Sequence, residues 1–374
     1  MKKNQTVFVG LSGGVDSAVS AALLKKAGYE VVGVFIKTWH PDFLICNEEE
    51  ERRDAMRVAA HLDIPFLTFD FEDVYKKEVA DYMIREYKAG RTPNPDVMCN
   101  KEVKFGAFLR KALSMGADYV ATGHYVSLRR CSKNSPLYPQ AGSDTDSFLL
   151  HLLRGNDPAK DQSYFLWTLK QEQLRKILFP IGDLKKTEVR KLAKKFNLPV
   201  AQKKDSQGIC FLGAVDLKYF LKHYIKEKKG KVLNTEGEEI GYHNGVVFYT
   251  LGERHGFTIT KKTSTDGAYY VVSKDIKKNI LVVSQFPSDK GGLRGVEFES
   301  KINLKNTNWI SKIPECDKNY TAQIRYHGEF LSCQIISARQ DLAEIIFGKP
   351  VMVASGQSCV FYDGDICLGG GVVV

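Results

Sequence analysis

The chain has 374 residues, of which 43% are hydrophobic, so it has room for two or three domains with a full core and is not a disordered protein. Its formal net charge of +10, from 54 basic and 44 acidic residues, indicates a polyanionic partner, although moderate basicity also occurs in proteins that bind none. No apolar run approaches the roughly 20 residues of a membrane-spanning helix, and no signal peptide is recognised, so we expect a cytoplasmic protein without a membrane partner. Eight cysteines without a Cys-x-x-Cys pair favour reduced thiols over a structural zinc site.

The first predicted strand, Thr6–Gly10, leads through a glycine-rich turn into a predicted helix over Ala18–Ala27. The turn, Ser12–Ser17, presents backbone N–H groups and a positive helix terminus to one anion. Its glycines let phosphate oxygens approach the backbone, its serines add hydroxyl donors, and Asp16 is placed to hold a cation or to cap the helix. The turn lacks the P-loop lysine and the Gly-x-Gly-x-x-Gly spacing, and it is similar to the pyrophosphate loop of enzymes that split ATP between its α and β phosphates. The plainer alternative is an ordinary Ser/Gly turn.

Strands and helices then alternate. Further strands are predicted at Glu30–Phe35, Phe66–Asp70 and Tyr119–Thr122, and helices at Glu48–Leu62, Asp73–Lys88 and Lys101–Met115. This alternation predicts an α/β domain with a doubly wound parallel sheet and a ligand site at the carboxyl ends of its strands. Ser12 and Gly123 both follow such strand ends, so we expect them to face one crevice.

The later part of the chain has a different texture. A polar stretch over Arg129–Asp146 predicts a hairpin or loop insertion, and helical patterns return at Gln171–Leu178 and Thr187–Phe196. From about Gly230 short strands dominate, at Val246–Leu251, Tyr269–Ser273, Ile280–Ser284, Ala322–Tyr326, Cys333–Ser337 and Gln357–Tyr362. We therefore expect a catalytic domain over 1–215, a central β-rich domain over 216–282 and a C-terminal β-barrel over 283–374.

Cys99 lies in a segment whose residue types favour a reactive thiol. Two prolines and a glycine in Gly90–Lys101 predict a shaped loop before Cys99, and Arg91, Lys101 and Lys104 bring positive charge. Because Cys99 directly precedes a predicted helix, we expect the N-terminal field to lower its pKa and favour the thiolate.

Cys210 lies in a second predicted loop, Lys203–Phe211, with lysines and a glycine. Taken alone, Cys99 and Cys210 each also fit a buried structural cysteine. The other cysteines have no comparable setting and are interpreted as structural or incidental: Cys46, Cys131, Cys316, Cys333, Cys359 and Cys367.

Three segments together resemble the bacterial tRNA-specific 2-thiouridylases: Ser12–Ser17, Gly90–Phe105 and Lys203–Leu212. Further matching motifs follow in the family's order, at Ala121–Tyr125, Lys160–Phe165, Thr250–Arg254 and Cys367–Gly371. The resemblance spans nearly the whole chain. The first loop is shared by many ATP pyrophosphatases, whereas the two cysteine segments are far more specific.

The resemblance implies ATP-dependent 2-thiolation of the wobble uridine of tRNA. The C2 oxygen is adenylated, pyrophosphate leaves, and a persulfide sulfur then displaces AMP. Cys210 would carry the persulfide, received from a sulfur donor protein, and Cys99 would attack it and form a transient Cys99–Cys210 disulfide. Asp96 would be the acid/base residue next to the target uridine. Without the resemblance, its position after Pro95 would favour an ordinary aspartate in a turn. Magnesium is expected with ATP, but the sequence does not locate its ligands.

The resemblance also implies two sets of binding residues. The expected ATP contacts are Gly10, Leu11, Ser12, Gly13, Gly14, Val15, Asp16, Ser17, Ile36 and Gly123. The expected tRNA contacts, around a base that leaves its stack, are Asn94, Pro95, Asp96, His124, Lys160, Asp161, Gln162, Arg325, Tyr326 and Gln357. The chain departs from the family at Ile36, where methionine is usual, and at Tyr269, where tryptophan is frequent.

Three alternatives stay open at this point. One is a ligase of the same ATP-pyrophosphatase superfamily that amidates a small metabolite, and another is a tRNA-binding module without catalysis. The third concerns mechanism: Cys99, Cys210 and Asp96 would ligate an iron–sulfur cluster. Thiolates are the usual ligands of such clusters, and only two cysteines are present here, so we favour the persulfide route.

Overall fold

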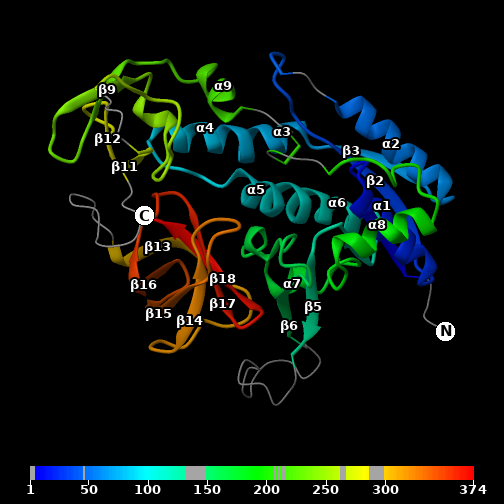
Figure 1. Cartoon of the computed structure of the whole chain (residues 1–374). Coiled ribbons are helices and arrows are strands. Elements are labelled where there is room, and N and C mark those ends of the chain that lie inside the picture. Colours follow the sequence, from blue (N-terminus) through cyan, green and yellow to red (C-terminus); the bar gives the residue numbers. More distant parts are fainter. Residues whose placement is uncertain are drawn as a thin grey trace.

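The computed structural model describes residues 5–44, 47–131, 149–205, 208, 210–211, 216–261, 267–285 and 299–374. Its N-terminal part is built on a parallel five-stranded sheet with the order β3-β2-β1-β4-β7 (Figure 1). The strands are β1 (Thr6–Gly10), β2 (Glu30–Lys37), β3 (Phe66–Asp70), β4 (Tyr119–Ala121) and β7 (Ile177–Leu178). The predicted α/β doubly wound fold is confirmed.

Helices cover both faces of this sheet because alternate strand residues point to opposite sides. Val7 and Val9 share one buried cluster with α1 (Val15–Lys26), α2 (Glu48–His61) and α8 (Lys186–Lys195). Phe8 belongs to the other cluster, which contains the second layer of helices. These are α3 (Glu72–Tyr75), η1 (Lys76–Ala80), α4 (Asp81–Lys88), α5 (Pro95–Met98), η2 (Cys99–Phe108) and α6 (Leu109–Ser114).

Two of the predicted helices contain π-helical segments. The helix predicted over Asp73–Lys88 is interrupted by the π-helical η1, and η2 is a ten-residue π-helix continuous with α5 and α6. The pattern predicted over Gln171–Leu178 also splits, into α7 (Gln171–Leu174) and the edge strand β7. The apolar pattern does not distinguish an α-helix from a π-helix or from a short strand, because each of them buries one side of the segment.

The central part forms a second five-stranded sheet with the order β10-β9-β8-β12-β11. Its strands are β8 (Gly230–Leu233), β9 (Glu239–His243), β10 (Thr258–Ile259), β11 (Tyr269–Asp275) and β12 (Ile280–Gln285), and α9 (Leu217–Lys222) precedes them. The strand predicted at Val246–Leu251 is wrong. Gly245, at φ 142°, turns the chain into the 3-10 helix η4 (Val246–Phe248), and the Val246 N–H donates to the side chain of Asn279 instead of a neighbouring strand.

The C-terminal part is a closed β-barrel, as predicted (Figure 1). Its strands are β13 (Glu299–Trp309), β14 (Asn319–Gln323), β15 (Leu331–Ala338), β16 (Leu342–Val351), β17 (Ser358–Asp363) and β18 (Ile366–Val373). The barrel closes because β13 pairs with both β16 and β18. The strand predicted over Ala322–Tyr326 ends earlier, at Gln323, where the Gln323 side chain donates to Gly328 O across the following turn.

A hairpin from the N-terminal part extends the barrel sheet. Its strands β5 (Val126–Arg130) and β6 (Leu150–Arg154) pair with each other, and β6 pairs with β18. The insertion predicted at Arg129–Asp146 falls largely outside the described residues. No helix among the described residues is long and apolar enough to cross a membrane.

Candidate active site

The Ser12–Ser17 loop joins β1 to α1 and is organised around the Ser17 hydroxyl. Ser12 N donates to Ser17 Oγ at 3.2 Å, and Ser17 Oγ donates to Gly14 O at the same distance. Within the described part of the chain, no side chain caps the N-terminus of α1. The backbone N–H groups at the start of α1 therefore suit a phosphate, which is the group that such a terminus binds best.

Two glycines allow this loop to be packed tightly. Gly13 has φ 70°, and a Cβ there would lie 2.4 Å from Glu51 O of α2. A Cβ on Gly123, just after β4, would lie 2.8 Å from Ser17 N. Neither position tolerates a side chain without displacing the backbone that forms the loop.

Asp16 is paired with a lysine from α8. Its carboxylate accepts hydrogen bonds from Lys186 Nζ at 2.7 and 2.8 Å and from the Tyr125 hydroxyl at 2.7 Å. Burial and the Asp16 carboxylate raise the pKa of Tyr125, which keeps its hydroxyl protonated as a donor. Asp16 thus holds a cationic side chain and does not cap α1. Lys186 and Tyr125 are not among the predicted site residues: Tyr125 lies in the Ala121–Tyr125 motif, but no local pattern pairs either residue with Asp16.

Asp205 anchors one end of the segment that contains Cys210. It pairs with Lys160 Nζ and Lys186 Nζ, each at 2.8 Å, and with the guanidinium of Arg190. Burial would raise the pKa of this carboxyl, but the two lysines lower it well below its usual range. The carboxylate is therefore charged, and it links α8 to the cysteine segment.

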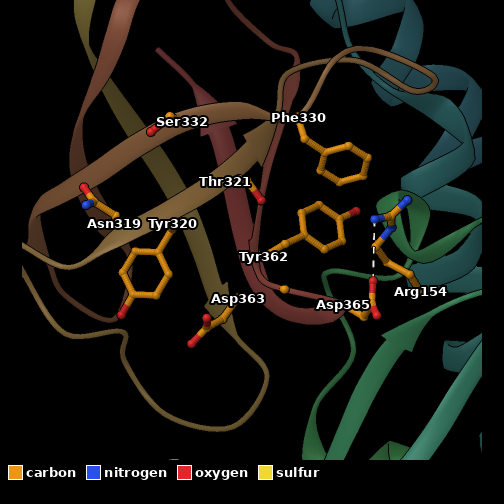
Figure 2. Close-up of a pocket in the computed structure, with 10 residues that line it drawn as sticks. Arg154, Asn319, Tyr320, Thr321, Phe330, Ser332, Tyr362, Asp363 and Asp365 are labelled. Carbon is orange, nitrogen blue, oxygen red and sulfur yellow. Dashed lines mark ion pairs between the residues drawn. The ribbon is translucent and has the colours of Figure 1, made fainter.

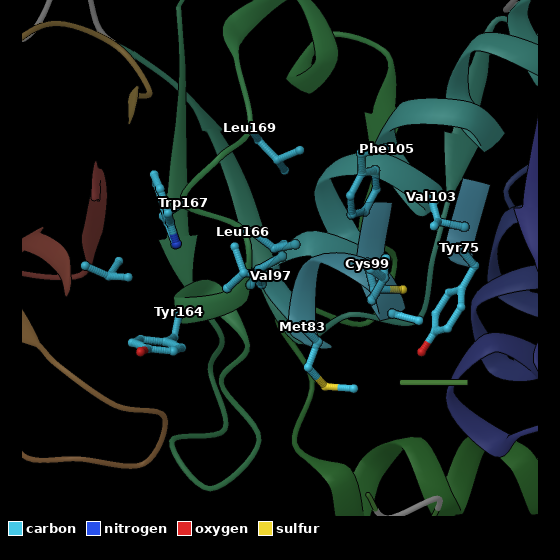
Figure 3. Packing of buried hydrophobic residues seen from close by; sticks show 14 of the residues in the cluster. Tyr75, Met83, Val97, Cys99, Val103, Phe105, Tyr164, Leu166, Trp167 and Leu169 are labelled. Atoms are coloured by element: carbon cyan, nitrogen blue, oxygen red, sulfur yellow. The ribbon is translucent and has the colours of Figure 1, made fainter. Parts of the chain in front are cut away.

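Cys99 and Cys210 lie side by side. Their sulfur atoms are 3.5 Å apart, and both thiols are free. Cys99 is completely buried on η2, among apolar side chains such as Val97 and Val103 (Figure 3). Cys210 is half-buried and faces the cavity described below.

Three hydrogen bonds hold the backbone around Cys210. Cys210 N donates to Asp96 Oδ1 at 2.9 Å, and the Tyr75 hydroxyl donates to Cys210 O at 2.8 Å. His40 Nε2 lies 2.8 Å from Phe211 O. Asp96 is therefore a structural partner of Cys210 as well as a lining residue, and burial raises the pKa of its carboxyl.

The predicted setting of Cys99 is wrong in one respect. Pro95 occupies the first turn of α5, where its missing N–H costs nothing, and the Asn94 side chain caps the helix by accepting from Val97 N. Cys99 therefore lies inside a continuous helix instead of just before one.

The expected thiolate at Cys99 is wrong as well. Burial and its hydrogen bond to Cys210 raise the pKa of Cys99 well above its ordinary value. The hydrogen bond from Cys99 and the charge of Lys104 lower the pKa of Cys210 to about 7 against the opposing effect of burial. In this pair Cys99 donates the hydrogen bond and Cys210 is the thiol that ionises more readily.

One cavity of about 850 Å³ joins the loop to Cys210. Its lining includes these predicted site residues: Gly10, Leu11, Ser12, Gly14, Val15, Asp16, Ser17, Ile36, Asp96, Gly123, His124, Lys160, Gln162, Cys210 and Tyr326. Lys104, Tyr125 and Asp205 also line it, although they were not predicted as site residues. The volume suits a nucleotide together with part of a second substrate.

The remaining predicted site residues do not line this cavity: Gly13, Asn94, Pro95, Cys99, Asp161, Arg325 and Gln357. Asp161 is buried and accepts from Gly155 N, Ser163 N and Ser163 Oγ at 3.0 to 3.1 Å, so it shapes the turn that carries Lys160 and Gln162. Arg325 is exposed after β14, and Gln357 lies half-buried in the turn before β17.

His124 lies buried in the cavity wall. Its Nδ1 is 2.8 Å from Thr122 Oγ1, and burial together with the charge of Lys104 holds its pKa well below the ordinary value. The imidazole is therefore neutral and cannot act as a phosphate-binding cation.

Among the described residues, no group of three or more His, Cys, Asp or Glu side chains is arranged to hold a metal ion. Cys99, Cys210 and Asp96 are close to one another but do not form such a group. A second cavity, of about 500 Å³, opens on the barrel, where the Arg154 guanidinium lies 4.1 Å from the Phe330 ring centroid and pairs with Asp365 at 3.6 Å (Figure 2). No predicted site residue lines it.

The doubly wound sheet and its Ser-Gly-Gly loop define an ATP-binding α/β protein of the HUP class. Residues 5–214 match the family described as tRNA methyl transferase HUP domain, 218–285 its PRC-barrel domain, and 299–373 the aminomethyltransferase beta-barrel domain. The tRNA-specific 2-thiouridylase MnmA of Streptococcus thermophilus is 44% identical over 98% of this chain and 94% of that protein. That of Geobacillus thermodenitrificans is 43% identical over the same shares. The chain belongs to the tRNA-specific 2-thiouridylase family.

Solved structures that resemble the chain are more distant. The U34-tRNA thiolase NcsA of Methanococcus maripaludis, with its [4Fe-4S] cluster, is 17% identical with a TM-score of 0.35, over 60% of this chain and 65% of that one.

Proposed function

We propose that this chain transfers sulfur to C2 of the wobble uridine of tRNA in an ATP-dependent reaction. The observation that carries the proposal is the shared cavity: the Ser12–Ser17 loop and Cys210 line the same space, and a second thiol, Cys99, lies 3.5 Å behind Cys210. An ATP-splitting loop activates an oxygen, and a thiol pair delivers a sulfur. One cavity that holds both suits the replacement of oxygen by sulfur.

The activation step falls to the loop and its neighbours. The α1 N-terminus and the Ser12 and Ser17 hydroxyls bind the phosphates of ATP, with Gly123 and Ile36 at the nucleotide and magnesium as the counter-ion. The C2 oxygen of uridine attacks the α-phosphate and pyrophosphate leaves. Adenylation is required because the C2 oxygen is otherwise a poor leaving group.

The sulfur steps fall to the thiol pair. Cys210 receives a sulfane sulfur from a persulfide-carrying donor protein, and the terminal sulfur of the Cys210 persulfide attacks C2 and displaces AMP. Cys99, after giving up its proton, attacks the Cys210 sulfur, and the bond to the transferred sulfur breaks with its electron pair on that sulfur. The products are 2-thiouridine and a Cys99–Cys210 disulfide, which an external dithiol reduces.

The tRNA contacts divide between the cavity and its rim. The target base must leave its stack to bring C2 to Cys210, and Tyr326, whose ring lies 4.3 Å from that of Phe165, offers it an aromatic surface. Asp96, His124, Lys160 and Gln162 line the cavity and surround the base, with Asp96 as the acid/base, and Asn94 and Pro95 contact the tRNA from outside the cavity. Arg325 and Gln357 contact the tRNA outside the cavity, and Asp161 supports the turn beside it.

Mass spectrometry of tRNA nucleosides after incubation with ATP and a persulfide source tests the proposal. We expect Cys210→Ser to abolish 2-thiouridine and to retain ATP binding and tRNA-dependent pyrophosphate release. The matched control is Cys316→Ser, because Cys316 is an exposed thiol on the barrel and is expected to have no effect.

Persistent thiolation in Cys210→Ser would contradict the role of Cys210. ATP cleavage that a small metabolite stimulates, and that is indifferent to both cysteines, would instead favour the amidating ligase. Binding of tRNA without any pyrophosphate release would favour a non-catalytic tRNA-binding module.

A further inference from the structure

The π-helical segment η2 brings a lysine to the face that carries Cys99. In a π-helix hydrogen bonds run from residue i to residue i+5, so residue i+5 returns close to the face of residue i. Cys99 is the first residue of η2, and Lys104 lies five positions later. Both side chains act on Cys210: the Cys99 thiol lies 3.5 Å from its sulfur, and Lys104, which lines the same cavity, lowers the pKa of the Cys210 thiol through its charge.

We propose that Lys104 is a positioning residue that holds Cys210 as the thiolate and thereby makes Cys210, and not Cys99, the acceptor of incoming sulfur. The inference rests on the proposed function, in which Cys210 accepts the sulfur and Cys99 later attacks the persulfide.

The groups around Cys210 support this assignment. Cys99 donates a hydrogen bond to it, Asp96 brings negative charge from α5, and the Tyr75 hydroxyl, from α3, donates to its carbonyl oxygen. Lys104 supplies the positive charge. Burial is the largest single influence on the pKa of Lys104 and lowers it, but Cys210, Cys99 and Asp96 together raise that pKa above its ordinary value, so the ammonium stays protonated.

The Lys104 side chain is also held near Cys210 by a neighbouring aromatic ring. Its Nζ lies 5.6 Å from the ring centroid of Phe211, the residue after Cys210, so a cation–π contact holds the ammonium at the segment that carries the thiol. Lys104 and Cys210 line the cavity together, which places the ammonium beside an incoming persulfide.

The positive charge of Lys104 is needed in the step in which Cys210 takes sulfur from the donor. The electron pair of the Cys210 thiolate forms a bond to the outer sulfur of the donor persulfide, R–S–SH. The donor S–S bond breaks and its electron pair leaves with R–S⁻, so the products are Cys210–S–SH and the donor thiolate. A protonated Cys210 would have to lose its proton first, and a neutral Lys104 would not stabilise the developing persulfide anion.

Alkylation of the full-length chain by iodoacetamide, followed residue by residue with mass spectrometry across pH 5 to pH 10, tests the inference without tRNA or ATP. We expect Lys104→Met to move the midpoint of Cys210 alkylation upward by about one pH unit, a roughly fivefold slower reaction at pH 7. Lys104→Arg should keep the wild-type midpoint. Lys101→Met is the matched control, because Lys101 is exposed on the same helix and pairs with Glu102.

An unchanged midpoint in folded Lys104→Met would overturn the inference, as would an equal shift in Lys101→Met. If Lys104→Met does not fold, Lys104→Gln removes the charge with a shorter side chain and is judged by the same midpoint. A second readout is loading by a small-molecule persulfide at pH 7, which should fall in parallel on Cys210. If the wild-type chain forms no 2-thiouridine while Lys104→Met still shows the Cys210 shift, the result counts against the proposed function and not against Lys104.

Discussion

Lys186 Nζ lies 2.7 Å from Asp16 Oδ1, so a lysine at the start of α8 neutralises a carboxylate inside the Ser12–Ser17 loop. The pair is largely shielded, since the Lys186 side chain is 13% exposed and that of Asp16 is 31% exposed. Lys186 also pairs with Asp205 at 2.8 Å. One lysine therefore links the Ser12–Ser17 loop to the segment that carries Cys210.

Replacing this lysine should weaken ATP binding. In Lys186→Met the Asp16 carboxylate has no counter-charge and repels the triphosphate, and two charges a few ångströms apart near a protein surface interact by a few kcal/mol. We expect at least a roughly tenfold loss of ATP affinity, about 1.4 kcal/mol, by isothermal titration calorimetry. Lys191→Met, on an exposed position of the same helix, should bind ATP normally. Equal ATP affinity in Lys186→Met and wild type would contradict this account of Asp16.

Adding one methyl group at Gly123 should disturb the same loop. The Cβ of Gly123→Ala would lie 2.8 Å from Ser17 N and from Asp16 C, both backbone atoms that cannot rotate away. Overpacking of this kind costs about 1 to 3 kcal/mol, so we expect a lower melting temperature and weaker ATP binding. Gly267→Ala is the control, because its Cβ meets nothing within 4 Å. A Gly123→Ala chain with wild-type melting and ATP affinity would show that the backbone yields more easily than the geometry indicates.

The sequence predicts the strand, turn and helix around Ser12–Ser17 better than the ionisation of the two thiols. Ser12–Ser17 is a local motif, so adjacent residues define its strand, turn and helix. The ionisation of Cys99 depends on burial and on Cys210, more than a hundred positions away, and local sequence reports neither. The Pro95 pattern misled for a related reason: proline both breaks a helix and begins one, and the choice depends on the cap that Asn94 provides.

Long-range partners account for what sequence patterns missed elsewhere. Lys186 and Asp16 come from separate helices, and their pairing follows from the packing of α8 against α1. Val246–Leu251 is apolar enough for a strand, but Asn279 takes the hydrogen bond of Val246 that a neighbouring strand would need. Strand propensity therefore gave way to tertiary contacts.

Removal of the Cys99 thiol should make Cys210 less reactive at neutral pH. The hydrogen bond from Cys99 is the largest influence lowering the pKa of Cys210 to about 7, so Cys99→Ala should raise that pKa. A hydrogen bond to a charged group contributes about 1.5 to 3 kcal/mol, or roughly one to two pH units. The pH dependence of Cys210 alkylation should shift upward by that amount, with Cys333→Ala as a control at a buried cysteine of the barrel. A downward shift would mean that Cys99 withdraws stabilisation from the thiolate.

A half-buried lysine in the central part of the chain should make stability depend on pH. Lys274 Nζ donates to Gly90 O at 2.9 Å and to Tyr249 O at 2.6 Å, and burial lowers its pKa to about 8. The unfolded chain holds this proton up to about pH 10.5, so between pH 8 and pH 10.5 unfolding takes up a proton and stability rises with pH. Below pH 8 Lys274 is charged in both states, and the full cost of burying the ammonium is present.

The measured quantity is the difference in the free energy of unfolding between wild type and a variant, because tyrosines and cysteines titrate in the same pH range and their contributions cancel in the difference. From pH 8 to pH 10.5 the free energy of unfolding of wild type should gain up to about 3 kcal/mol relative to Lys274→Met, as a shift of about 2.5 pKa units implies. Urea unfolding at several pH values measures this difference. Lys277→Met, an exposed lysine in the turn after β11, should give a constant difference from wild type. A constant difference for Lys274→Met as well would mean that its two carbonyl partners stabilise the ammonium enough to cancel the cost of burial.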